Sequence, residues 1–115
     1  MPVHPVLTQL RKLSAKLPES NERETWGHPT FRVGEKIYAS FGVGESGASV
    51  SCKQTHLDQA VLVKDPRFSV ARYVGRHGWI SIRADEVKWP MIEDLVVKSY
   101  RLIAPKKLSA RLRMP

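Results

Sequence analysis

The chain has 115 residues and carries 19 lysines and arginines against 11 aspartates and glutamates, so its formal net charge is +8. This length suits one domain with a single core, and 42% hydrophobic with 26% charged residues are typical of a globular protein rather than a disordered one. The apolar runs are far shorter than the roughly 20 residues that span a bilayer, and no basic segment followed by an apolar core opens the chain. We therefore expect a soluble, cytoplasmic monomer with no membrane association.

The positive charge is concentrated in two stretches that contain no acidic residue. One lies between Asp65 and Asp85, the other follows Asp94, and together they hold ten of the 19 lysines and arginines. Such clustering is typical of proteins that bind polyanions, either nucleic acid or an acidic protein surface. A solvated basic surface that only maintains solubility is the alternative.

A first amphipathic helix is predicted over residues 5–17, where apolar residues recur at steps of three and four until Pro18 ends the pattern. The apolar positions are Val3, Val6, Leu7, Leu10, Leu13 and Leu17. Its polar face is basic and contains no acidic residue. We expect this helix to pack on a sheet.

Two strands follow a polar connection over residues 19–24. The first covers residues 30–33, and a two-residue turn that begins with Gly34 leads to the second, residues 36–41. In both segments apolar and polar residues alternate. The predicted inward positions are Phe31, Val33, Ile37, Ala39 and Phe41.

Residues 42–47 match the G-x-G-x-x-G pattern of dinucleotide-binding proteins. That site requires a helix directly after the glycines, so that the helix N-terminus holds the pyrophosphate. Residues 48–53 instead alternate with a period of two, which predicts a strand. We interpret the glycines as a flexible hairpin.

Thr55 is predicted to cap a second helix that runs to about residue 64, with Leu57, Ala60 and Val61 on its buried face. Residues 67–74 then predict a loop with a short strand. Residues 79–83 predict another strand whose inward residues are two isoleucines, Ile80 and Ile82.

A last long helix begins at Pro90 and ends before Pro105. Its predicted buried stripe consists of Ile92, Leu95, Val96, Ser99, Leu102 and Ile103. Residues 106–115 are predicted to form a basic C-terminal tail or a short amphipathic turn. The element order is helix, three strands, helix, two strands, helix, which predicts a two-layer, single-domain α+β fold with an antiparallel sheet covered by helices.

The turn at residues 75–78 is the segment least explained by folding alone. Its tip presents Arg76 and His77 between two glycines, and Trp79 follows on the outer face of the next strand. Loops on a rigid scaffold often carry binding side chains, and an indole beside arginines is a stacking surface. A solvated turn and a Trp covered by a neighbouring element are the alternatives.

Five separated segments of the chain read WGHPTFRV at residues 26–33, KIYASF at 36–41, VSCK at 50–53, YVGRHGW at 73–79 and SYRLIAPK at 99–106. Together they resemble the MmcQ/YjbR family of small bacterial proteins over nearly the whole chain. The resemblance implies a fold similar to the frataxin/CyaY-like and secretion-chaperone-like two-layer domains. It also implies a DNA-binding role through a proposed double-wing surface, and no enzymatic reaction.

The central turn departs from the family pattern. Many members read Asn-Lys-x-His-Trp, whereas Gly78 separates His77 from Trp79 in this chain. Arg76 can replace the basic residue of that pattern. Any role of His77 carries over only loosely.

Neither catalysis nor metal binding is expected. The candidate nucleophiles and bases are Ser40, Ser81, Cys52, His28 and His77. They match no recognised catalytic sequence motif. The four histidines lie far apart in the sequence, with a single cysteine, and the first helix lacks the carboxylates that iron would require. We expect a non-enzymatic protein with no cofactor and no metal.

The sequence therefore favours weak, salt-sensitive DNA binding through a basic face. The expected nucleic-acid-binding residues are Arg32, Lys53, Arg72, Arg76, Arg83, Lys106 and Lys107. The candidate stacking or cleft residues are Trp26, Tyr73, His77 and Trp79. The alternative is a protein-interaction or small-ligand-binding module with no nucleic-acid role, whose cleft lies between the sheet and the loops at Trp26 and Trp79.

Overall fold

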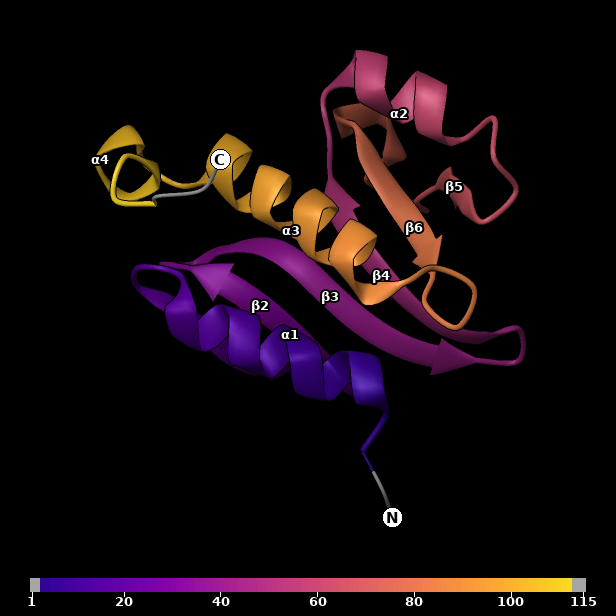
Figure 1. The fold of residues 1–115 in the computed structure, drawn as a ribbon, viewed down its shortest axis with the longest axis horizontal. Helices are drawn as coiled ribbons and strands as arrows, with labels where there is room; N and C mark the ends of the chain where they lie inside the picture. The colour runs from indigo at the N-terminus through magenta and orange to yellow at the C-terminus, as the bar shows by residue number, and fades with distance from the viewer. Residues whose placement is uncertain (1–2, 113–115) are drawn as a thin grey trace.

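A computed structural model describes residues 3–112 of the chain (Figure 1). Its helices are α1 (Pro5–Lys16), α2 (His56–Leu62), α3 (Trp89–Ile103) and α4 (Lys106–Ser109), with a 3-10 turn at Gly75–His77. Its strands are β1 (Ser20–Thr25), β2 (His28–Val33), β3 (Lys36–Gly44), β4 (Gly47–Lys53), β5 (Phe68–Val70) and β6 (Trp79–Arg83). These elements confirm the predicted α+β class.

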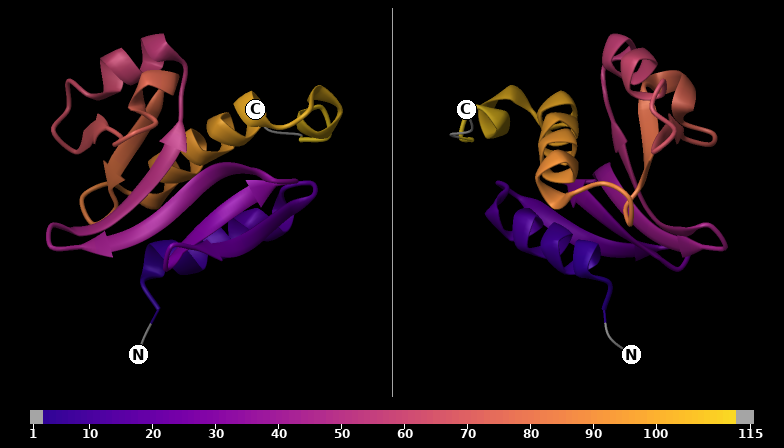
Figure 2. Two further views of the ribbon diagram at one scale, coloured as in Figure 1. Left: turned by 180° about the vertical axis from the view of Figure 1, so that it is seen from behind. Right: turned by 45° about the vertical axis from the view of Figure 1, so that its right-hand side comes forward.

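The strands form one sheet in the order β1-β2-β3-β4-β6-β5, and every neighbouring pair is antiparallel. The long helices α1 and α3 lie side by side over one face of this sheet, as Figures 1 and 2 show from three directions. Among residues 3–112, no long helix covers the other face. The two-layer architecture predicted from the sequence is confirmed, and one face of the sheet is left open.

Strand β1 lies where the sequence predicted a polar connection. The strand pairs with β2 along its whole length, from Ser20 opposite Val33 to Thr25 opposite His28. It occupies the edge of the sheet, where polar side chains are common because one side of the strand faces water. The sequence of β1 therefore shows no apolar alternation, although the segment forms a strand.

Ile37 does not share the buried face of β3, contrary to the prediction. Phe31 lies opposite Ala39 and Arg32 lies opposite Ile37, so Tyr38 is an extra residue that forms a β-bulge. The bulge turns Tyr38 inward, where its side chain is buried at the edge of the Tyr100 ring. Ile37 consequently points to the open face together with Arg32.

The core lies between the helices and the inner face of the sheet. Its sheet residues include Phe31, Val33, Ala39, Phe41, Val50, Ile80 and Ile82, and its helix residues include Leu7, Leu10, Ile92 and Leu95, all buried as predicted. Ile37 is the one member of the predicted core face that lies outside this set. The predicted parity is thus confirmed for β4 and β6, which contain no bulge.

The prediction that α2 buries an apolar face is wrong. Leu57 and Val61 are 75% and 58% exposed, and no residue of α2 is buried. Gln59 holds the helix instead, since its side-chain amide donates to the carbonyls of Gly75 and Trp79.

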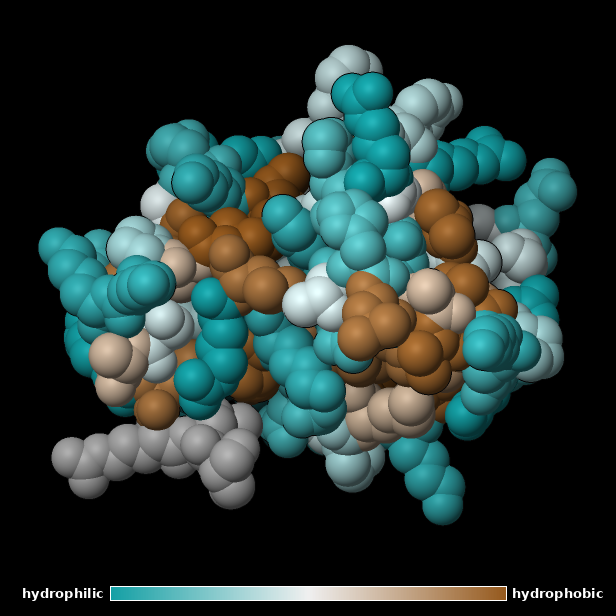
Figure 3. Space-filling model, turned by 90° about the horizontal axis from the view of Figure 1, so that it is seen from above, coloured by the Kyte–Doolittle hydropathy of each residue, from teal (hydrophilic) through white to brown (hydrophobic). Residues whose placement is uncertain are grey.

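Figure 3, seen from the side on which α2 lies, shows two apolar areas separated by a band of hydrophilic side chains.

The stripe of α3 differs from the prediction at its C-terminal end. Leu102 is 45% exposed, whereas Tyr100 is fully buried and donates a hydrogen bond to the carbonyl of Pro18. The following segment is the short helix α4 rather than a tail, because Leu108 is buried against the core. Arg113, part of the predicted basic stretch, lies outside the described residues.

Candidate binding surface on the open face of the sheet

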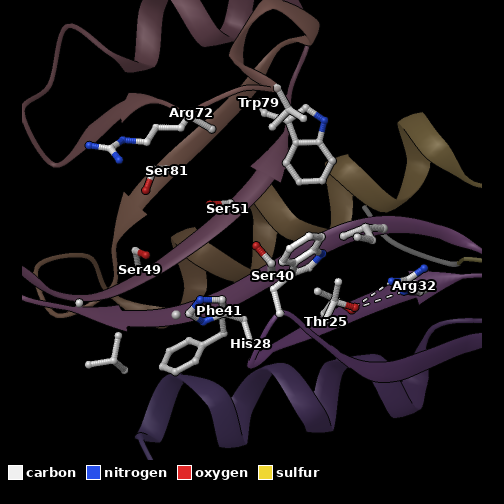
Figure 4. Close-up of a pocket in the computed structure, with 18 of the residues that line it drawn as sticks. Thr25, His28, Arg32, Ser40, Phe41, Ser49, Ser51, Arg72, Trp79 and Ser81 are labelled. Atoms are coloured by element: carbon white, nitrogen blue, oxygen red, sulfur yellow. Dashed lines mark hydrogen bonds between the residues drawn. The ribbon is translucent and has the colours of Figure 1, made fainter.

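A broad hollow of about 1050 Å³ lies on the sheet face that α1 and α3 leave open. Residues of all six strands line it, together with the loop that follows β5. Figure 4 shows this hollow with the ribbons of the helices behind the sheet.

Short hydroxyl side chains form the floor of the hollow. Thr30 lies opposite Ser40, Ser40 opposite Ser51, Ser51 opposite Ser81, and Ser81 opposite Ser69, so one continuous row crosses five strands. Figure 4 shows Ser40, Ser51 and Ser81 following one another in this row. Their strand neighbours, such as Val50 and Ile80, point into the core, so the row faces outward by strand alternation. Small side chains on a curved sheet leave the hollow open.

Arg32 is held firmly at one side of this floor without a carboxylate partner. Its Nη2 donates to Oγ1 of Thr25 at 2.9 Å, its Nη1 donates to the carbonyl of Glu35 at 3.1 Å, and its Nε donates to Oγ1 of Thr30 at 3.4 Å. The Glu35 carboxylate pairs with Arg23 instead, at 2.8 Å, and this hydrogen bond lowers the pKa of the Glu35 carboxyl. The Arg32 guanidinium is therefore positioned, and it makes no ion pair within 4.0 Å among residues 3–112, although its charge also helps to lower the pKa of the Glu35 carboxyl.

Arg72 lines the opposite side of the hollow, in the loop after β5. Within residues 3–112, no ion pair within 4.0 Å involves Arg32 or Arg72, whereas Arg11, Arg67 and Arg83 each have a carboxylate partner. Figure 4 shows Arg72 and Arg32 on different sides of the serine row. The two guanidinium groups thus flank a neutral polar floor.

Two further predicted cations belong to the same sheet face. Lys53 lies opposite Trp79, and Arg83 lies opposite Ser49, and both Trp79 and Ser49 line the hollow. Register therefore places Lys53 and Arg83 on the open side. Arg83 is tied to Glu86 at 3.2 Å, which reduces its availability to a ligand.

Aromatic side chains stand at the margins of the hollow. Trp79 is half-buried, at the start of β6, and Figure 4 shows its indole extending from that strand over the hollow. Trp26 is 93% exposed and sits in the two-residue turn between β1 and β2. His28 follows that turn, and its ring lies close to Gly42 on the neighbouring strand β3.

The glycine-flanked turn lies outside the hollow. Arg76 and His77 are exposed, and the Nε of Arg76 contacts the Nε2 of His77 at 3.3 Å. Tyr73 is 94% exposed and does not line the hollow, although Arg72 and Val74 on either side of it do. His77 therefore does not share the hollow with Trp79, the first residue of β6 after this turn.

Lys106 and Lys107 lie apart from the other predicted cations. Both belong to α4, which continues from α3 in the helical layer (Figure 1). The seven predicted cations therefore do not form one face. Arg32 and Arg72 share the hollow, Lys53 and Arg83 share its sheet face, Arg76 is in the turn, and the two lysines are on α4.

Sequence reasoning missed the hydroxyl floor. The signal was present, since Ser40, Ser51 and Ser81 occupy outward positions next to correctly predicted inward residues. What the sequence did not provide was the register that joins these positions into one row. Thr25 was likewise missed, because its strand was not predicted.

The candidate nucleophile Cys52 is not available for chemistry. Its side chain is fully buried, and burial raises the pKa of the thiol to about 12. Among residues 3–112, no group of three or more His, Cys, Asp or Glu side chains is arranged to hold a metal ion. No helix in this part of the chain combines the length and apolar character needed to cross a bilayer.

Comparison with known proteins identifies a family and two solved structures of similar fold. The YjbR family model matches residues 15–102. A crystal structure of a Deinococcus radiodurans protein with a DUF419 domain superposes with a TM-score of 0.77 at 20% identity, covering 95% of this chain and 88% of that one. A crystal structure of a Pseudomonas syringae protein superposes with a TM-score of 0.70 at 18% identity, covering 84% and 97% of the two chains. No curated protein matches the sequence.

Proposed function

The chain belongs to the YjbR family, and we propose that it is a non-enzymatic protein that binds nucleic acid, DNA in particular, through the open face of its sheet. One observation carries this proposal: Arg32 and Arg72 flank a floor of hydroxyl groups, and neither has a carboxylate partner among the described residues. Such an arrangement suits phosphate groups, because guanidinium and hydroxyl groups commonly donate hydrogen bonds to phosphate oxygens.

Arg32 is the better prepared of the two cations. A guanidinium has five N–H groups, and the three hydrogen bonds of Arg32 leave two of them free. Because those bonds already fix the side chain, binding an anion would cost little additional side-chain entropy. The hydroxyls of Ser40, Ser51 and Ser81 can donate to further phosphate oxygens.

The proposal concerns binding without strong sequence preference. The open face is a sheet, and in the described part of the chain no helix projects from it that could enter a major groove and read base edges. Phosphate contacts would then supply most of the affinity, and the net charge of +8 would add long-range attraction.

Fluorescence anisotropy with labelled oligonucleotides tests the proposal. The double variant Arg32→Ala/Arg72→Ala should bind at least about tenfold more weakly than the wild type at 50 mM salt, with a shallower dependence of affinity on salt. The double variant Lys106→Ala/Lys107→Ala removes the same charge from α4 and is the matched control. Equal losses in both variants, or no binding at tens of micromolar protein, would contradict the proposed surface.

A second candidate function is supported by the size of the hollow. About 1050 Å³ is close to the upper end of the range for small-molecule sites, roughly 300–1,000 Å³. A small anionic ligand, or an acidic segment of a partner protein, would use the same Arg32 and Arg72. A ligand with one or two charges would lose little affinity between 50 and 200 mM salt, whereas a polynucleotide would lose much more.

A further inference from the structure

We infer that the open face takes a single strand of nucleic acid rather than a duplex, with bases stacked on Trp26 and Trp79 and phosphates held by Arg32 and Arg72. The inference rests on the proposed function and adds to it the strand preference and the stacking residues. It depends on the backbone at Trp26, on the position of Trp79, and on the shape of the floor.

Trp26 is placed in a way that folding does not explain. Its φ is +55° and that of Gly27 is +80°, so the pair forms a tight turn in which both residues are left-handed. Asn-Gly and Asp-Gly are favoured in such turns, whereas a bulky residue is a genuine outlier there. The indole is also 93% exposed, so it contributes little apolar burial in return. Tyr73 shares both features but lies outside the hollow, whereas Trp26 lines it, where a ligand can cover the indole.

Trp79 supplies a second aromatic surface on the same hollow. It is only half-buried, it lines the hollow, and its cross-strand neighbour is Lys53. A base that stacked on this indole would place its own phosphate near a cation. Some known sheet domains bind single-stranded nucleic acid in this way. Helices cover one face of their sheet, and aromatic side chains on the other face stack on the bases.

The floor has dimensions that suit a strand of nucleic acid. Five residues in a row across neighbouring strands, about 4.8 Å apart, give a floor roughly 19 Å long. The side chains of the floor are short, and Trp26 and Trp79 both line the hollow, with the Trp79 indole extending over it in Figure 4. A duplex keeps its bases paired and stacked inside and would offer only its backbone to this surface. A single strand exposes base faces that the indoles can stack against.

Oligonucleotide binding at 50 mM salt tests the strand preference. A labelled 12-mer of thymidine should bind at least roughly tenfold more tightly than a duplex of the same length, and it should quench tryptophan fluorescence. Equal affinities for the two, with both weakened in Arg32→Ala/Arg72→Ala, would overturn this inference while leaving the proposed function standing. No binding of either would overturn both.

The variant Trp26→Asn separates a ligand role from a folding role. Asn suits the left-handed turn, so the variant should be at least as stable as the wild type, yet its affinity for the single strand should fall by about fivefold or more. Tyr73→Asn is the matched control, because Tyr73 is also left-handed, with φ +64°, and 94% exposed, but lies outside the hollow. Trp79→Ala should behave like Trp26→Asn in binding. Unchanged single-strand affinity in both Trp variants would overturn the stacking role.

Discussion

Ser99 of α3 donates a hydrogen bond from its hydroxyl to the carbonyl of Tyr38, the bulged residue of β3, at 2.6 Å. The same oxygen accepts the backbone N–H of Lys53, at the end of β4, at 2.8 Å. Ser99 is fully buried, and its single hydroxyl serves both backbone groups. One hydroxyl therefore joins the helical layer to β3 and β4, at the residue of β3 that bulges from its pairing with β2.

Replacing Ser99 by Ala should destabilise the protein by about 1–3 kcal/mol, because two buried backbone groups would lose their partner. Urea denaturation followed by circular dichroism would measure this difference. Ser109→Ala is the control, since its hydroxyl bonds the carbonyl of Lys106 in an exposed setting. If both variants unfold at the same urea concentration as the wild type, the bridge does not contribute to stability.

Replacing Phe41 by Ala should cost on the order of 3 kcal/mol, through lost apolar burial and the cavity that remains. Phe41 is 5% exposed and lies opposite Val50 in the core face of the sheet. Val43→Ala on the same strand, at a position 66% exposed, should change the free energy of unfolding by less than about 0.5 kcal/mol. A melting temperature of Phe41→Ala equal to that of the wild type would contradict the core assignment.

The sequence predicted those parts of the fold that depend on regular periodicity. The apolar spacing of α1 and the alternation of β4 and β6 correspond to buried residues in the structure. Two errors arose where periodicity is broken or not required, whereas the regular apolar spacing of α2 is left exposed by the fold. A bulge at Tyr38 reversed the direction of Ile37, and the edge strand β1 carries no apolar alternation.

The sequence predicted several residues of the candidate site but not that they lie around one hollow. Arg32, Arg72, Trp26 and Trp79 were recognised from charge and aromatic character, yet only strand register brings them around one hollow. The sequence equally suggested Lys106 and Lys107, because charge clustering along the chain does not reveal which layer a segment joins. Register and layer are tertiary properties, set by the packing of α1 and α3 on the sheet.

Cys52 should not react with a thiol reagent at pH 8 while the protein is folded. Burial raises the pKa of its thiol to about 12, so almost no thiolate is present, and the side chain is inaccessible. A colorimetric disulfide reagent should release no signal in buffer and one equivalent in denaturant. Fast, stoichiometric reaction of the folded protein would show that β4 is more open than described.

The hydrogen bond between His4 and Asp85 predicts a pH-dependent part of the stability. The Asp85 carboxylate accepts a hydrogen bond from Nε2 of His4 at 2.7 Å and from the N–H of Ala48 at 3.1 Å, and these bonds lower the pKa of Asp85. A group whose pKa is lower in the folded state stabilises the protein above its unfolded pKa, about 3.9, and that contribution is lost as the pH falls through the folded pKa.

Asp85→Asn should therefore be less stable than the wild type at pH 6, and the difference should shrink as the pH is lowered below about 4. Urea denaturation at several pH values would measure it. Glu45→Gln, in the exposed β3–β4 turn, is the control for loss of one negative charge. A difference that persisted unchanged at pH 2–3 would mean that the carboxylate charge does not contribute.

Gly78 should be the least replaceable glycine of the central turn. Its φ is +91°, and a Cβ atom there would lie 2.2 Å from the carbonyl oxygen of Gln54, whose N–H donates to the Gly78 carbonyl at 2.9 Å. Gly78→Ala must therefore strain the backbone and move the neighbouring segment, at a cost above about 1 kcal/mol. Gly44→Ala is the control, because a Cβ atom at Gly44 would have no neighbour within 4 Å and the residue does not require a positive φ.

The same substitution should also affect the open face. Trp79 follows Gly78 directly, so a shift of the turn would displace the indole from the hollow and weaken ligand binding beyond the loss of stability. Unfolding in urea and single-strand binding at 10 °C, where the variant stays folded, would separate the two effects. A Gly78→Ala variant with wild-type stability and wild-type binding would show that the turn does not position Trp79.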